Sequence, residues 1–131
     1  MTDVASKKAV LLVDDDKFLL DMYLMKFQQA GYDVHACLSV ADALKALRDG
    51  FSPSAVVFDL IMPGGDGFFL LDSLKKEKLA PDAPKIALTN EMSDDEKKRV
   101  SELGGTRYLV KAMMIPSEVV DAVAAEIAKK K

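Results

Sequence analysis

Five short hydrophobic runs occur along the chain. Four of them end at a polar residue whose side chain can bind a ligand or take part in a reaction. Ala9–Val13 ends at three consecutive aspartates, and Ala55–Phe58 ends at Asp59. Uninterrupted apolar runs of this length are typical of strands buried on both faces of a parallel sheet. The other runs are Lys85–Leu88 before Thr89, Tyr108–Val110 before Lys111, and the more mixed Asp33–Cys37. We expect the mixed run to be an edge strand.

Helical patterns separate these runs. Phe18–Ala30 has a helical hydrophobic face and is followed by Gly31, a residue that commonly ends helices. The predicted buried face consists of Leu19, Met22, Tyr23 and Phe27. Ser93–Glu96 has the spacing of a capping box, which predicts a helix that stops near Gly104. The other predicted helices are Ser39–Asp49, Asp66–Lys78 and Ser117–Lys129.

Strands that alternate with helices predict an α/β fold with right-handed crossovers. We therefore expect a doubly wound five-stranded parallel sheet with helices on both faces and the flavodoxin-like strand order 2-1-3-4-5. No internal repeat or long linker interrupts the alternation, so residues 1–131 are predicted to form a single domain. Residues 1–8 are expected to be flexible, and residues 129–131 to form a basic tail.

Composition and charge exclude several classes of protein. The chain is 50% hydrophobic and 30% charged, as in ordinary soluble domains. A net charge of −3 argues against a nucleic-acid-binding surface, which requires clustered basic residues. No apolar run approaches the roughly 20 residues of a membrane span. Because Cys37 is the only cysteine, no internal disulfide can form, and we expect a cytoplasmic protein that binds neither membrane nor nucleic acid.

The polar residues that close the strands gather at one edge of the predicted sheet. If the first and third strands are neighbours, Asp14, Asp15 and Asp59 converge there. Their mutual repulsion should raise at least one carboxyl pKa unless a cation neutralises them. Magnesium (Mg2+) fits this set best, because it prefers oxygen ligands and needs few protein groups.

A metal-bound acidic cluster can also carry out phosphoryl chemistry. Asp59 is the candidate nucleophile, because an ionised carboxylate can attack phosphorus in line. Lys111 would place a positive charge near the phosphoryl oxygens, and Thr89 would donate a hydrogen bond to them.

These residues resemble the CheY-like receiver domains of bacterial two-component signalling, over nearly the whole chain. Val13–Asp15 is similar to the acidic pair of that family, Asp59–Gly67 to its acceptor strand and loop, and Thr89 and Lys111 to its switch positions. The resemblance implies that Asp15 and Asp59 contact Mg2+ directly and that Asp14 acts largely through water. It further implies that the Ile61 carbonyl is a metal ligand and that Tyr108 is the switch aromatic.

The function implied by the resemblance is that of a phosphoacceptor switch. Asp59 would take a phosphoryl group from a histidine kinase or phosphotransfer protein, and the altered surface would bind a downstream protein target. Such a domain is not an enzyme beyond its own phosphorylation and dephosphorylation. One departure is Ala112, because the family usually has proline there after a cis bond. Since cis bonds before other residues cost about 3 kcal/mol, we expect Lys111–Ala112 to be trans.

Other interpretations remain open. A haloacid-dehalogenase-like phosphatase would use Asp14 as its nucleophile, a flavodoxin-like carrier would bind a cofactor on the same sheet, and a pseudo-receiver would only bind proteins. Asp16 fits a helix N-cap better than a metal ligand. Tyr108 is as compatible with simple core packing as with a switch. His35 is expected to be an ordinary surface residue.

Overall fold

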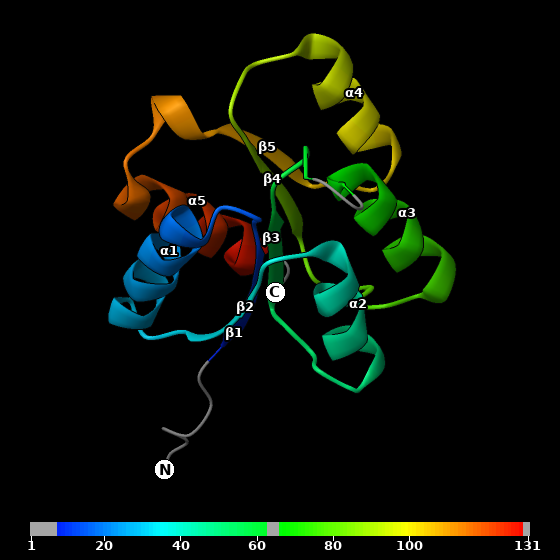
Figure 1. Ribbon diagram of the computed structural model, residues 1–131, viewed down its shortest axis with the longest axis horizontal. Helices are drawn as coiled ribbons and strands as arrows, with labels where there is room; N and C mark the ends of the chain where they lie inside the picture. The colour runs from blue at the N-terminus through cyan, green and yellow to red at the C-terminus, as the bar shows by residue number, and fades with distance from the viewer. Residues whose placement is uncertain (1–7, 63–65, 130–131) are drawn as a thin grey trace.

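The computed structural model describes residues 8–62 and 66–129, which form a sheet covered by helices on both faces (Figure 1). The strands are β1 (Ala9–Val13), β2 (Asp33–Cys37), β3 (Ala55–Phe58), β4 (Lys85–Thr89) and β5 (Arg107–Val110). The helices are α1 (Lys17–Gln29), α2 (Val40–Arg48), α3 (Gly67–Glu77), α4 (Asp94–Glu102), η1 (Lys111–Met113, a 3-10 helix) and α5 (Pro116–Lys129). None of the helices described is long and apolar enough to cross a membrane.

Some sequence-based expectations concern residues outside these ranges. Residues 1–7 of the segment predicted to be flexible are not among the described residues, and neither are residues 130–131 of the basic tail. Residues 63–65 of the loop after β3 also lie outside them.

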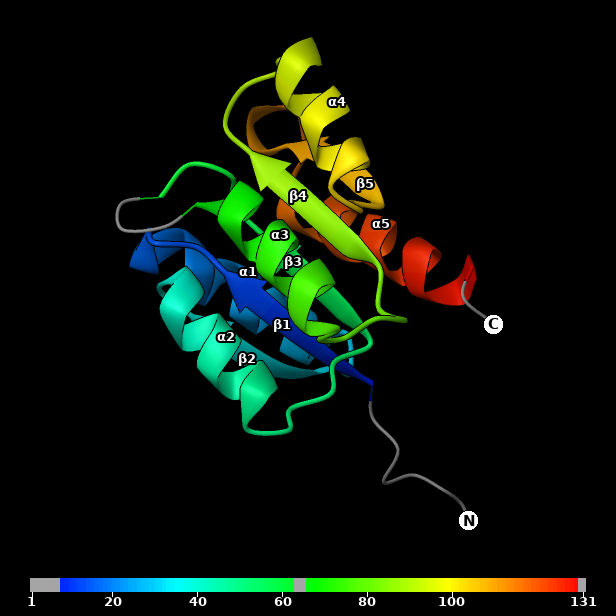
Figure 2. The same ribbon diagram turned by 90° about the vertical axis from the view of Figure 1, so that its right-hand side faces the viewer.

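The sheet has the predicted topology. All neighbouring strands are parallel, and their order is β2-β1-β3-β4-β5. The mixed run Asp33–Cys37 forms β2 at one edge, as predicted. Because all strands point the same way, their carboxyl ends lie along one edge of the sheet, with β1 and β3 adjacent (Figure 2).

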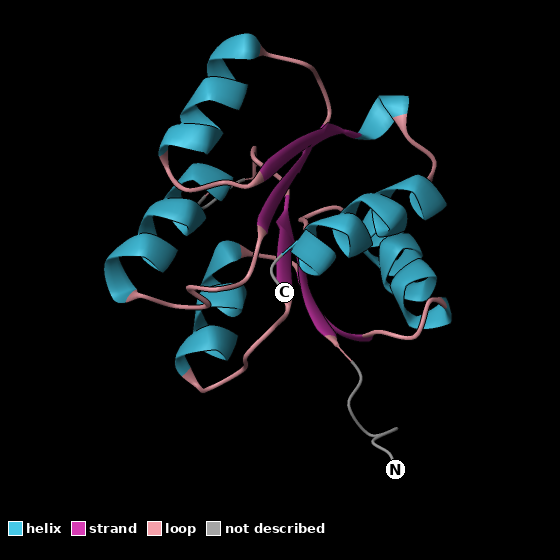
Figure 3. Cartoon of the chain, turned by 180° about the vertical axis from the view of Figure 1, so that it is seen from behind, coloured by secondary structure: helices cyan, strands magenta, loops and turns pink. Residues whose placement is uncertain are grey.

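Helices α1 and α5 cover one face of the sheet, and α2, α3 and α4 cover the other (Figure 3). Side chains from the inner strands alternate between two cores: Leu12 and Val57 pack with α1 and α5, whereas Leu11 and Val56 pack with the opposite helices. Because both faces are buried, these strands are apolar at successive positions.

Helix α1 buries a slightly different face from the one predicted. Leu20, Tyr23 and Phe27 are buried and follow the spacing of a single helical stripe. Leu19 and Met22, which were predicted to share this face, flank the stripe and are only partly buried. The prediction was therefore correct for Tyr23 and Phe27 and missed Leu20.

The connection after β5 also follows the prediction. None of the described peptide bonds is cis, so the Lys111–Ala112 bond is trans. The chain continues from Lys111 into η1, and α5 begins at Pro116.

The single cysteine gives a prediction for the pH dependence of stability. Burial, reinforced by the charge of Asp42, raises the pKa of the Cys37 thiol from 9.0 to about 11. The unfolded chain therefore loses this proton at a lower pH than the folded protein does. We expect the contribution of the Cys37 thiol to the free energy of unfolding to be fully present below pH 9. It should fall by about 2 kcal/mol as the pH rises toward 11.

Urea unfolding of wild type and Cys37→Ala at several alkaline pH values measures this effect. Other groups that titrate in this range are common to both proteins, and the packing lost in the variant is a constant offset. The difference in unfolding free energy between the two proteins should shrink as the pH rises. A difference that does not depend on pH would contradict the prediction.

Candidate functional site

Three charged residues directly after β1, β3 and β5 come together at the carboxyl edge of the sheet. Leu12 of β1, Val57 of β3 and Leu109 of β5 all pack toward α1 and α5. The residues two positions further along the chain are Asp14, Asp59 and Lys111. Because strand side chains repeat every second residue, Asp14 and Asp59 are directed toward the α1 and α5 side at the carboxyl edge, and Lys111, the first residue of η1, contacts both of them there.

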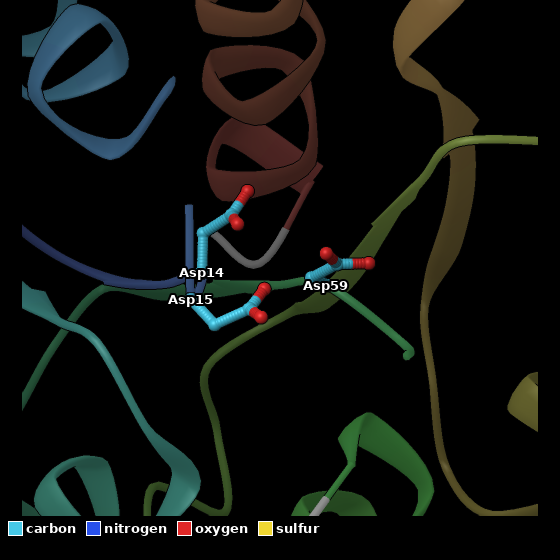
Figure 4. Close-up of side chains that lie close together, drawn as sticks. All are labelled: Asp14, Asp15 and Asp59. Atoms are coloured by element: carbon cyan, nitrogen blue, oxygen red, sulfur yellow. The ribbon is translucent and has the colours of Figure 1, made fainter. Parts of the chain in front are cut away.

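The acidic residues converge as predicted. Oxygen atoms of Asp14, Asp15 and Asp59 all lie within 4.8 Å of one another (Figure 4). Asp14 and Asp59 are only 5% and 4% exposed, whereas Asp15 is open to solvent. The cluster therefore has a buried part and a side that ligands can reach.

Lys111 joins the two buried carboxylates. Its Nζ donates to Asp14 Oδ2 at 2.7 Å and to Asp59 Oδ2 at 3.3 Å. Burial alone would lower the pKa of Lys111, but its hydrogen bond to Asp14 and the attraction of both carboxylates outweigh burial and raise the pKa. The side chain is thus a charged ammonium group inside the site, 8% exposed.

The pKa of Asp59 is raised, in the direction expected from the sequence but with a different main cause. Burial contributes most, Lys111 opposes it, and repulsion from Asp14 adds to it. The Ile61 N–H also opposes the shift, through a long hydrogen bond of 3.4 Å to Asp59 Oδ1. Repulsion between carboxylates is therefore a secondary effect, because Lys111 offsets part of it.

The charges and atoms of this cluster fit a hard divalent cation. Lys111 neutralises one of the three carboxylates, which leaves two negative charges to balance. All three acids offer oxygen atoms, the ligands that Mg2+ prefers. Among the described residues, this is the one cluster of His, Cys, Asp or Glu with such spacing.

Thr89 and Tyr108 lie on the adjacent strands β4 and β5. Thr89 ends β4 and is 3% exposed, and its hydroxyl has no hydrogen-bond partner within the described ranges. Tyr108 is partly buried against the core under α2 and α3, and its hydroxyl contacts the loop between β4 and α4. Tyr108 thus combines core packing with a polar contact. Packing in the core is therefore compatible with the predicted role as a switch residue.

The predicted capping box consists of two hydrogen bonds between Ser93 and Glu96, and the Tyr108 hydroxyl takes the place of Glu96 in one of them. Ser93 Oγ accepts from the Glu96 N–H at 3.3 Å, so Ser93 caps α4 as predicted. The Ser93 N–H, however, donates to Tyr108 Oη at 3.2 Å instead of to the Glu96 side chain. Tyr108 Oη in turn donates to the Glu91 carbonyl at 2.9 Å. A side chain of β5 therefore holds both ends of a short segment before α4.

Two other sequence-based readings are confirmed. Asp16 is the N-cap of α1 and accepts from the Leu19 N–H at 3.2 Å. It lies outside the acidic cluster. His35 is an exposed residue of the edge strand, with its ring 5.1 Å from that of Phe51.

Two residues that were not predicted as site residues also shape the site. A Cβ atom on Gly67 would lie 2.5 Å from the Asp59 carbonyl oxygen, so only glycine fits at the start of α3. Tyr23 of α1 lines a small cavity together with Asp14 and Asp59, a position that its apolar stripe alone does not reveal. Both relations depend on how α1 and α3 dock onto the sheet, which short sequence patterns do not specify.

Comparisons with known proteins agree on one family. The model of the response regulator receiver domain matches residues 10–124. The phosphate regulon transcriptional regulatory protein PhoB of Pseudomonas aeruginosa is 30% identical over 113 residues, which cover 86% of this chain and 48% of that protein. The chain thus spans about half the length of this curated relative.

Solved structures give the same result. The receiver domain of the Francisella response regulator 1452 is 27% identical with a TM-score of 0.85, and the match covers 95% of this chain and 100% of that one. The Vibrio cholerae chemotaxis protein CheY4 is 27% identical with a TM-score of 0.83, covering 92% of this chain and 99% of that one.

Proposed function

Because the chain belongs to the response regulator receiver domain family, we propose that Asp59 is its phosphoacceptor and that Lys111 and Thr89 stabilise the transferred group. Receiver domains of two-component signalling are phosphoacceptors rather than classical enzymes. The observation that best supports Asp59 is its buried carboxylate, which lies in the acidic cluster with the Lys111 ammonium 3.3 Å away. A nucleophile and a cation for the phosphoryl oxygens therefore share one site.

In the proposed reaction, an Asp59 carboxylate oxygen attacks the phosphorus of a phosphohistidine. The new O–P bond forms as the P–N bond breaks, and the bonding electrons stay with the imidazole nitrogen. Lys111 turns from the carboxylates toward the phosphoryl oxygens, and the Thr89 hydroxyl donates to another of them. When bound, Mg2+ supplies positive charge that offsets the negative charge of the phosphoryl group. Asp14, Asp15, Asp59 and the Ile61 carbonyl would hold it.

The proposed partners follow from this chemistry. The donor is a histidine kinase or a phosphotransfer protein, and the output is a contact with a downstream protein target. Direct nucleic-acid binding is not part of the proposal, because the chain has a net charge of −3. Loss of the phosphoryl group by attack of water returns the domain to its first state. We place this signalling in the cytoplasm, where a lone thiol such as Cys37 remains reduced.

Phosphorylation by acetyl phosphate, followed by mass spectrometry of the intact protein, tests the assignment. Wild type should gain one phosphoryl group in the presence of Mg2+ and none in excess chelator. Asp59→Asn, which keeps the size of the side chain but not its charge, should gain none under either condition. Equal labelling of Asp59→Asn and wild type would refute Asp59 as the acceptor.

The bridge made by Tyr108 supports a role for this residue and Thr89 in switching. A hydrogen bond from Thr89 to a phosphoryl group would pull on the end of β4, next to the segment that Tyr108 holds. We expect a beryllofluoride complex, a phosphoryl mimic, to shift the amide signals of residues 90–96 in wild type. Tyr108→Phe should change these signals before the mimic is added, because it lacks the bridging hydroxyl. Superimposable wild-type spectra with and without the mimic would rule out the switch.

A further inference from the structure

Tyr23 carries a buried polar group that the proposed function does not use. Its side chain projects from α1 into the core, and the residue is 5% exposed. Within residues 8–62 and 66–129, its hydroxyl has no hydrogen-bond partner. Buried hydroxyls are nearly always hydrogen-bonded, to protein or to ordered water, because burying an unsatisfied one is costly.

A small cavity is lined in part by Tyr23. Its volume is about 10 Å³, which is about the space required by one water molecule. The polar residues in its wall are Tyr23, Asp14 and Asp59, and the rest of the wall is apolar. A buried water typically makes two to four hydrogen bonds, and Tyr23, Asp14 and Asp59 are the residues of this wall whose side chains carry hydrogen-bonding groups.

The geometry of α1 explains why Tyr23 reaches the acids. Helical side chains lean toward the N-terminus of their helix, and α1 begins at Lys17, beside the acidic cluster. Electrostatics indicates the same proximity. Burial raises the pKa of Tyr23, Lys111 opposes this shift, and Asp14 and Asp59 add to it.

Asp59 is the more weakly held of the two buried carboxylates. Asp14 accepts hydrogen bonds of 2.9 Å and 2.7 Å, from the Asp16 N–H and from Lys111. Within the part of the chain that the structure describes, Asp59 accepts only longer ones, of 3.4 Å from the Ile61 N–H and 3.3 Å from Lys111. The plane of the Asp59 carboxylate is therefore less firmly fixed, and both of its oxygens can accept further hydrogen bonds.

We propose that Tyr23 is a positioning residue for the phosphoacceptor, whose hydroxyl holds one water molecule in the cavity as a hydrogen-bonded bridge to the Asp59 carboxylate. This inference rests on the proposed role of Asp59. The bridge fixes the rotation of the carboxylate, so that one oxygen points toward the incoming phosphorus. In-line attack depends steeply on such orientation.

Tyr23→Phe removes the hydroxyl and keeps the ring, and Tyr32→Phe is its matched control. Tyr32 is partly buried in the same core, with its ring 5.7 Å from that of Phe27, and it is not part of the cavity wall. We expect Tyr23→Phe to lower the phosphorylation rate at saturating phosphoramidate by about 5-fold or more, because the water loses the hydroxyl that holds it against the Asp59 carboxylate. Mg2+ affinity and the donor concentration for half-maximal rate should stay at wild-type values.

A spectroscopic readout separates this role from packing. The chain has three tyrosines, so protein with a 13C label at the tyrosine Cζ gives three signals, and Tyr23→Phe identifies that of Tyr23. This signal should shift in Asp59→Asn, whereas the Tyr32 signal should not. An unchanged rate in Tyr23→Phe, an equal loss in Tyr32→Phe, a parallel loss of Mg2+ affinity or an unmoved Tyr23 signal would each overturn the proposal.

Failure of this inference is distinguishable from failure of the proposed function. If Asp59 is not the acceptor, Asp59→Asn still becomes labelled. If only the water bridge is wrong, Asp59→Asn loses the label while Tyr23→Phe behaves like wild type.

Discussion

Replacing Lys111 with methionine is expected to slow phosphorylation by roughly 100- to 1000-fold, a typical effect of losing one group that stabilises transition-state charge. The same change should strengthen Mg2+ binding. In wild type the Lys111 ammonium lies 2.7 Å from Asp14 Oδ2 and 3.3 Å from Asp59 Oδ2, so it competes with a cation for both carboxylates. Methionine has similar length but no charge, and it leaves both acids to the metal.

A slower phosphorylation rate together with a higher Mg2+ affinity would show that Lys111 competes with the metal. General damage to the site would instead lower both. The Mg2+ affinity comes from a metal titration followed by tyrosine fluorescence or calorimetry, and the rate from single-turnover labelling with acetyl phosphate. Lys45→Met is the control, because Lys45 pairs with Asp49 on the exposed surface of α2. It should match wild type in both assays. Weaker Mg2+ binding by Lys111→Met would contradict the proposed competition.

Gly67→Ala is expected to lower the free energy of unfolding by about 2–3 kcal/mol, because the added methyl group overpacks a rigid region. It would lie 2.5 Å from the Asp59 carbonyl oxygen, 2.8 Å from the Phe58 ring and 3.0 Å from the Leu60 Cα. Two of these contacts are with backbone atoms, so relief requires movement of the chain that carries Asp59. Phosphorylation should slow at least 10-fold, because small displacements of a nucleophile have large effects on rate.

Gly50→Ala provides the comparison for this variant. Gly50 has a φ of +108°, which disfavours alanine, but no atom lies within 4 Å of the new methyl group. Its expected cost is about 1–2 kcal/mol from backbone strain, with a normal phosphorylation rate. Urea unfolding and single-turnover labelling of both variants measure the two effects. A Gly67→Ala protein with the wild-type phosphorylation rate would show that the start of α3 does not fix Asp59.

The fold was predictable because its signals are local. Each inner strand is buried on both faces, so runs such as Ala55–Phe58 are uniformly apolar and their ends are sharp. Topology then brings Asp14, Asp15 and Asp59 to one edge without any knowledge of side-chain packing. The same reasoning identified the edge strand Asp33–Cys37.

The parts that were missed depend on packing between distant elements. The competition between Glu96 and Tyr108 for the Ser93 N–H depends on how β5 lies against the start of α4. The contact of Lys111 with Asp14 spans most of the chain and gives no periodic signal. The main cause of the raised pKa of Asp59 is likewise its degree of burial, which only the assembled core determines.

The central claim is that Asp59, and not another acid of the cluster, carries the phosphoryl group. The most direct measurement is to label wild-type protein with acetyl phosphate and Mg2+, reduce the acyl phosphate with borohydride, and map the modified residue by peptide mass spectrometry. Reduction converts a phosphorylated aspartate to homoserine, which marks the position permanently. Homoserine at residue 59 is the predicted result. Homoserine at residue 14 would contradict it and would favour a phosphatase that uses Asp14 as its nucleophile.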